Sequence, residues 1–173
     1  MKIGGLAKDY GNVKPEVLEK AAARGTAVHK AIELLNDNDL DWDSLHPEIA
    51  PRVGAYQQFV LDSGWRHLHA EQMLYSHRGF AGQMDEIGML NKKRTLLDFK
   101  SSYEKDQAAW NVQTQAYLEL WNENHPEVEI NACFALWLNR NGEYELIDTN
   151  DREGWAMFEH ALAIAKWREK HGR

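Results

Sequence analysis

The chain has 173 residues, of which 43% are apolar and 27% are charged, values typical of one globular domain. No stretch approaches the roughly 18 consecutive apolar residues of a membrane-spanning helix, and the N-terminus lacks the apolar run of a signal peptide, so we expect a cytoplasmic protein. The net charge of −7 argues against a general nucleic-acid coat, although an acidic metal site beside a basic groove is compatible with it. A single cysteine, Cys133, excludes an internal disulfide and an iron–sulfur cluster held within the chain.

Hydrophobic periodicity predicts an α/β fold in a single domain over residues 1–173. Helices are expected at about residues 15–35, 47–63, 107–122 and 151–170, with a break in the first at Gly25-Thr26. Strands are expected at about residues 65–75, 80–90, 95–100, 130–138 and 143–147. The N-terminal helices (15–63) thus precede a core (about 65–138) and a C-terminal strand and helix (143–170). Because one helix connects the third and fourth strands, the sheet is expected to be mixed and flanked by helices.

The second and third expected strands bring together two carboxylates and a lysine. Asp98 and Lys100 are two residues apart on a strand and therefore share a face, whereas Phe99 points into the core. If Lys92-Lys93 form the turn centre, Asp85 lies opposite Lys100 and diagonal to Asp98, on the same face. Glu86 then falls on the other face, opposite Phe99, and a one-residue bulge would reverse both assignments.

These three side chains have the chemistry that phosphodiester hydrolysis requires. Two carboxylates on one face repel unless a cation lies between them, and Mg²⁺ prefers such oxygen ligands. A bound metal activates water, and a neighbouring ammonium can hold that water or neutralise charge on phosphate. An Asp-x-Lys pattern alone is more often a solvated strand face. Here Asp85 lies on the same face of the neighbouring strand, between Gly82 and Gly88. These features put a catalytic interpretation on equal terms with a solvated strand face.

Four short patterns in order resemble the PD-(D/E)XK nuclease superfamily, in its RecB-like exonuclease branch. The patterns span residues 25–117 and are Gly25-x-x-x-His29, Gly82-x-x-Asp85, Asp98-x-Lys100 and Gln113-x-x-x-Tyr117. Each is weak alone, and the order of expected elements matches the αβββαβ core of that family, a restriction-endonuclease-like fold. The resemblance is to short stand-alone nucleases of the kind that phages carry, so a phage-encoded protein would act in a bacterial host cell.

The resemblance implies a role for each matched residue. Asp85 and Asp98 would bind Mg²⁺ or Mn²⁺ (one or two ions) with the Phe99 carbonyl, and Lys100 would be the catalytic lysine. His29 would lie near the metal or bind it, and Gln113 and Tyr117 would contact nucleic acid. In isolation, His29 is better explained as a surface or core histidine, and the Gln113–Tyr117 pair as helix packing.

Several further residues are weaker candidates. Glu71, on the strand before the hairpin, could support the metal or be a surface residue, and Ser101 and Ser102 could contact phosphate or form a turn. Basic residues that flank the motifs could line a groove: Arg24, Lys30, Arg78 and Lys105. Three nearby histidines could suggest a zinc site: His67, His69 and His77. Their spacing gives no clear third ligand on the same element, so a zinc site is disfavoured.

Three functions therefore remain to be distinguished. The first is a metal-dependent DNA exonuclease acting in recombination, repair or processing, with DNA as its partner and with a homo-oligomer or a recombination protein left open. The second is a catalytically weak DNA-binding or inhibitor module of the same fold. The third is an unrelated zinc hydrolase that uses the histidines. No Gly-x-x-x-x-Gly-Lys-[Ser/Thr] loop occurs, so no ATP motor is expected.

Overall fold

The computed structural model describes residues 14–172, which fold as an α/β structure around one five-stranded sheet. The helices are α1 (Pro15–Asn36), a short 3-10 helix η1 (Trp42–Ser44), α2 (Ala50–Ser63), α3 (Gln107–Asn124) and α4 (Glu153–Lys170). The strands are β1 (Arg66–Ser76), β2 (Phe80–Leu90), β3 (Lys93–Lys100), β4 (Ala132–Leu138) and β5 (Tyr144–Asp148). The expected element order and the mixed sheet are confirmed, because β3 and β4 are parallel and the other neighbouring pairs are antiparallel.

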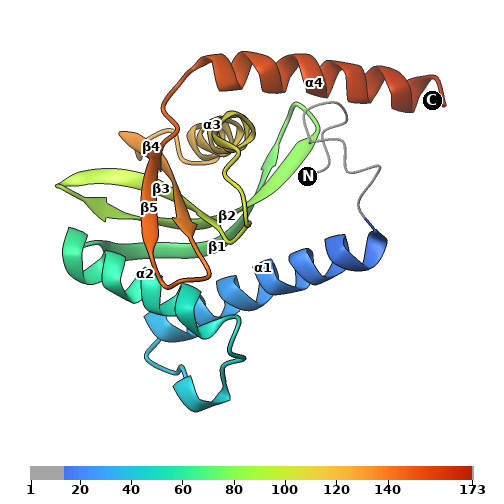
Figure 1. Cartoon of the computed structure of the whole chain (residues 1–173). Coiled ribbons are helices and arrows are strands. Elements are labelled where there is room, and N and C mark those ends of the chain that lie inside the picture. Colours follow the sequence, from blue (N-terminus) through green and yellow to red (C-terminus); the bar gives the residue numbers. More distant parts are fainter. Residues whose placement is uncertain (1–13, 173) are drawn as a thin grey trace.

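The sheet has helices on both faces, as Figure 1 shows. Helices α1 and α2 cover one face, where Val53, Tyr56 and Phe59 pack against Leu97 and Phe99 of β3. Helix α3 covers the other face, and α4 lies outside α3 in a further layer. The strand order β1-β2-β3-β4-β5 places β3 in the middle of the sheet, so its side chains are enclosed on both faces.

The β2–β3 hairpin has a different register from the predicted one. Its turn is Asn91-Lys92, with φ of 49° and 66°, rather than Lys92-Lys93. A two-residue hairpin turn favours positive φ at both positions, and asparagine tolerates that conformation well. Glu86 consequently pairs with Leu97 instead of Phe99, and the prediction that Asp85 lies opposite Lys100 is wrong. The shift is two residues, so the predicted separation of faces survives.

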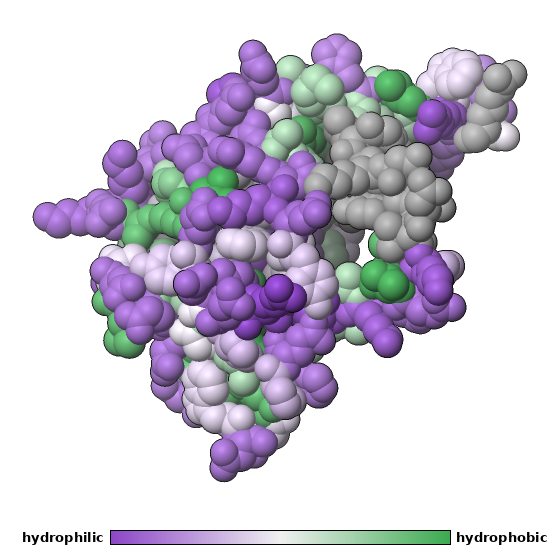
Figure 2. Space-filling view, in the orientation of Figure 1, coloured by the Kyte–Doolittle hydropathy of each residue, from purple (hydrophilic) through white to green (hydrophobic). Residues whose placement is uncertain are grey.

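Helix α1 is continuous, which corrects the predicted break at Gly25-Thr26. Thr26 does not cap a new helix, because its hydroxyl donates to the Ala22 carbonyl one turn earlier. This unbroken helix places Gly25 near Ser101, which follows β3, and His29 against the Phe99 ring. No helix within residues 14–172 is long and apolar enough to cross a membrane. The face in Figure 2 is mostly hydrophilic, with small separate apolar areas.

Candidate functional site

The site begins where β2 and β3 separate. Their last backbone pair is Glu86 with Leu97, and beyond it the Asp85 carboxylate replaces a backbone partner. Its Oδ2 accepts a hydrogen bond of 2.6 Å from the Phe99 amide. The Asp85 side chain is thereby fixed beside the backbone of β3, next to Asp98.

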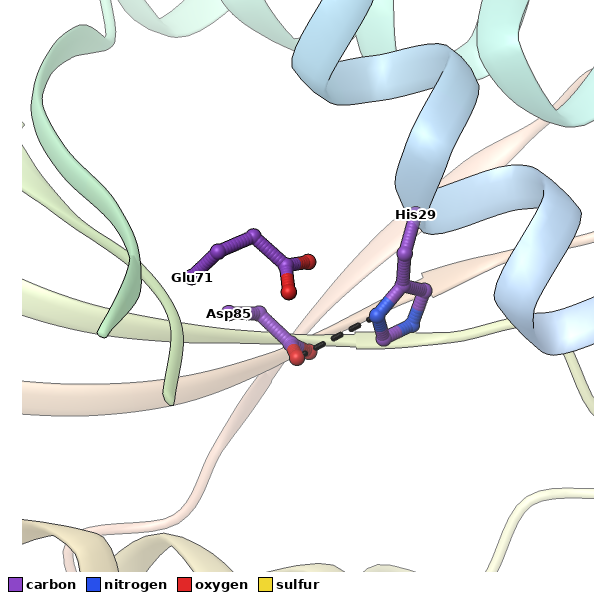
Figure 3. Close-up of side chains that lie close together, drawn as sticks. All are labelled: His29, Glu71 and Asp85. Atoms are coloured by element: carbon purple, nitrogen blue, oxygen red, sulfur yellow. Dashed lines mark ion pairs between the residues drawn. The ribbon is translucent and has the colours of Figure 1, made fainter. Parts of the chain in front are cut away.

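His29 and Glu71 reach the same carboxylate from two other elements (Figure 3). His29, on α1, places Nδ1 3.2 Å from Asp85 Oδ1. Glu71, on β1, offers a carboxylate oxygen, and one ligand atom from each of the three residues lies within 4.8 Å of the others. Glu71 has a φ of 50°, a strained conformation for a residue with a side chain. Strain of this kind concentrates at functional sites, so the β1 backbone supports a local role for Glu71.

Asp98 and Lys100 form the second half of the site. Asp98 is 2% exposed, and its Oδ2 lies 2.5 Å from Lys100 Nζ. Apart from this ion pair, Oδ2 accepts no hydrogen bond. Lys100 Nζ also donates to Gln113 Oε1 at 2.7 Å, and Gln113 Nε2 contacts the Tyr117 hydroxyl at 2.8 Å. Helix α3 and Asp98 thus both hold the lysine ammonium in place.

Burial and neighbouring charges together shift the pKa values of the site residues. Burial raises the pKa of Asp98 to about 6; Lys100 opposes this rise, and Asp85 adds to it. Burial and the charge of Asp85 also raise the pKa of Glu71. For His29, burial lowers the pKa, but the hydrogen bond and charge of Asp85 outweigh burial, and the net pKa is raised. Neighbouring carboxylates thus raise the pKa of His29, whereas burial is the main cause of the raised pKa values of Asp98 and Glu71.

A divalent cation fits this donor set. The carboxylate oxygens of Asp85 and Glu71 are hard ligands that suit Mg²⁺ and Mn²⁺, and the imidazole nitrogen of His29 is accepted better by Mn²⁺. Asp98 does not belong to this group of three residues. The buried Asp98 Oδ2, short of hydrogen bonds, is the kind of atom that a metal satisfies. A hollow of about 300 Å³ opens beside His29, Glu71 and Asp85, and its other lining residues are Thr26, Lys30, Glu33 and Gln83.

The remaining predicted residues fall in several places. Ser101 is buried near α1, and the exposed Ser102 donates to the Glu104 carbonyl. All four basic candidates pair with carboxylates: Arg24 with Glu48, Lys30 with Glu33, Arg78 with Glu159 and Lys105 with Glu145. Within residues 14–172, no group of three potential metal ligands includes the histidines considered for zinc. Those histidines have other contacts: His67 pairs with Glu86, His77 pairs with Glu123, and the His69 ring lies beside Trp121.

Two residues of the site were missed by sequence reasoning. Gln83 Nε2 donates to Glu71 and so fixes its carboxylate. Glu33 lines the hollow one helical turn beyond His29. The i, i+4 spacing of His29 and Glu33 on α1 could have identified Glu33, whereas no sequence signal marks Gln83.

Comparison with known proteins leaves the family open. No family model and no curated protein matches the chain. One solved structure that resembles it is the crystal structure of SSO0001, with 13% sequence identity and a TM-score of 0.38. That likeness covers 66% of this chain, and the chain spans 57% of the other. A likeness this distant assigns neither a family nor an activity.

Proposed function

We propose that this chain is a divalent-metal-dependent nuclease that hydrolyses phosphodiester bonds in DNA. The observation that carries the proposal is the group of potential metal ligands His29, Glu71 and Asp85, with the buried ion pair of Asp98 and Lys100 beside it. Three carboxylates (Glu71, Asp85 and Asp98) gather beside one lysine and one histidine, and a divalent cation would offset the remaining negative charge.

Asp85 and Asp98 would hold the ion, with His29, Glu71 and the Phe99 carbonyl as further ligands. When bound, Mg²⁺ or Mn²⁺ lowers the pKa of a coordinated water and offsets charge on the phosphate. Lys100 is held by Asp98 and Gln113, so its ammonium is positioned to donate to the attacking water or to a phosphate oxygen. Tyr117, 8% exposed, acts mainly by positioning Gln113.

A cleavage assay with a matched lysine variant tests the proposal. DNA labelled at one end, single- or double-stranded, is incubated with wild type, Lys100→Gln or Lys93→Gln, in Mg²⁺, Mn²⁺ or EDTA. Lys93 lies at the other end of β3 and is exposed, so its substitution removes the same charge outside the site.

We expect cleavage only with metal, and an unchanged cleavage rate in the control Lys93→Gln. In Lys100→Gln the rate should fall about 10²–10³-fold, the usual effect of removing one transition-state donor. Release of nucleotides from labelled ends, without internal fragments, is the expected product pattern of an exonuclease. Equal rates in the two lysine variants would contradict the proposed role of the site.

A further inference from the structure

Three arginines surround one exposed tyrosine on the loop between β3 and α3. Arg24 of α1, Arg52 of α2 and Arg140 of the β4–β5 turn place their guanidinium carbons 4.5, 6.0 and 5.8 Å from the centre of the Tyr103 ring. Figure 1 shows the β4–β5 turn beside α2, and Gly142 of that turn lies against Pro51. Three separate segments thus contribute one positive charge each to a single place.

This arginine cluster (Arg24, Arg52 and Arg140) carries more positive charge than its neighbours neutralise. Glu48 lies 3.2 Å from Arg24 and accepts from the Tyr103 hydroxyl at 3.1 Å. Among the described residues, Glu48 is the one carboxylate that forms an ion pair with the cluster. Three guanidinium groups and one carboxylate leave an excess of two positive charges, in a protein whose net charge is −7.

Arg52 shows most clearly that this excess is costly. It is 0% exposed, and its Nη1 donates to the Glu48 carbonyl at 2.6 Å. Its Nε and Nη2 have no hydrogen-bond partner, and Arg24 Nε lacks one as well. Burying a charged group without full pairing is unfavourable, so an anion at this place would stabilise the cluster.

Tyr103 and Arg140 also line a hollow that adjoins the chain just after β3. The hollow measures about 280 Å³ and is lined by Ser102, Tyr103, Trp137, Asn139, Arg140 and Asn141. Arg24 and His29 both lie on α1, so the cluster and the candidate active site draw residues from the same helix.

We propose that the arginine cluster and its hollow bind a phosphate group of the nucleic-acid strand, away from the bond that is cut. Guanidinium groups match phosphate oxygens in pairs, and the Tyr103 ring holds them in position. Arg140, the exposed member, makes the direct contact, and Arg24 and Arg52 supply buried positive charge beneath it. This inference rests on the proposed function for the identity of the strand, and its test measures binding without cleavage.

The test is the salt dependence of DNA binding in EDTA, followed by the fluorescence anisotropy of a labelled single-stranded oligonucleotide. The variants are Arg140→Ala, Arg24→Gln and a control, Arg168→Ala, which removes an exposed arginine on α4, in the layer beyond α3. Losing one phosphate contact should reduce the slope of log K against log salt by about 0.7–1. At about 0.1 M salt, such a loss corresponds to about five-fold weaker binding.

We expect this loss in Arg140→Ala and Arg24→Gln, and wild-type slopes in Arg168→Ala. Oligonucleotides with and without terminal phosphates, and competition by inorganic phosphate, show whether the bound group is internal, terminal or free. A cluster that only braces α1, α2 and the β4–β5 turn would instead lower the melting temperature of Arg140→Ala without changing its slope, and this result would overturn the inference.

The outcomes also separate this inference from the proposed function. Absence of cleavage together with a reduced slope in Arg140→Ala would refute the nuclease and leave the phosphate site standing. Metal-dependent cleavage together with equal slopes in Arg140→Ala and Arg168→Ala would refute the phosphate site and leave the nuclease standing.

Discussion

Substitution Asp98→Asn should make the metal-free protein more stable while it abolishes cleavage. Asp98 is buried beside Asp85, and at neutral pH its negative charge is held in a place that disfavours it. Asparagine has nearly the same shape and carries no charge, so it resembles the protonated carboxyl. A site that exists to bind a cation should therefore lose function and gain stability with one change.

The magnitude follows from the pKa shift. Burial raises the pKa of Asp98 from 3.8 to about 6, a net shift that already includes the attraction of Lys100. Two pKa units, at about 1.4 kcal/mol each, correspond to about 3 kcal/mol. For a raised carboxyl pKa, the stabilising effect of the proton is complete below the unfolded pKa, roughly 3.9, and is lost as pH rises through about 6. The advantage of Asp98→Asn should accordingly open between about pH 4 and 6 and stay constant above.

Thermal unfolding in EDTA at several pH values provides the measurement. At pH above about 7, the variant should melt about 6–12 °C higher than wild type, since about 1 kcal/mol shifts the melting temperature of a domain of this size by about 2–4 °C. Addition of Mg²⁺ or Mn²⁺ should raise the melting temperature of wild type and leave that of the variant unchanged. A variant less stable than wild type at every pH would refute this electrostatic account of the site.

Two further predictions concern stability away from the site. Gly88→Ala should destabilise the fold by about 1–3 kcal/mol in urea denaturation, because an added Cβ would lie 2.6 Å from the Arg66 carbonyl oxygen. The control Gly54→Ala, whose added Cβ would meet nothing within 4 Å, should instead stabilise α2 by about 0.5–1 kcal/mol. The hydrogen bond to Glu86 raises the pKa of His67. The stabilisation that this bond provides should be complete below about pH 6.5 and should be lost as pH rises through the raised pKa. His67→Gln should remove this part of the pH dependence of unfolding, and an unchanged pH profile would contradict it.

The sequence predicted the element order well because its apolar residues follow clear helix and strand periods. It also predicted that Glu86 lies on a different face from Asp98: Glu86 is 1% exposed and contacts Tyr56 of α2. The predicted register was wrong by two residues because four polar residues in succession, Asn91 to Arg94, left the turn centre undetermined. Parity survived that error, since a shift of two residues keeps every side chain on its face.

Other parts of the site could not be predicted because they depend on where strands separate. The bond from the Phe99 amide to Asp85 exists only because the β2–β3 ladder stops at Glu86. The positive φ of Glu71 is likewise a local backbone feature with no glycine to announce it. The contact of Gln113 with Lys100 requires the position of α3 over the sheet, which periodicity alone does not give.

The arginine cluster illustrates the same limit. Arg24 stood out as a basic residue near a motif, but its partners Arg52 and Arg140 come from segments far apart in the sequence. Only the packing of α2 and the β4–β5 turn around Tyr103 brings them together. An acidic net charge therefore says little about local charge at a binding surface.

The most direct test of the central claim is the initial rate of nucleotide release from end-labelled DNA as Mg²⁺ or Mn²⁺ is titrated. Wild type should show no release in EDTA and a rate that rises with metal to saturation. Asp98→Asn, folded as judged by its melting temperature, should show no rise at any metal concentration. Release that persists in EDTA, or equal metal-dependent rates in wild type and Asp98→Asn, would contradict the assignment of this site as the catalytic centre.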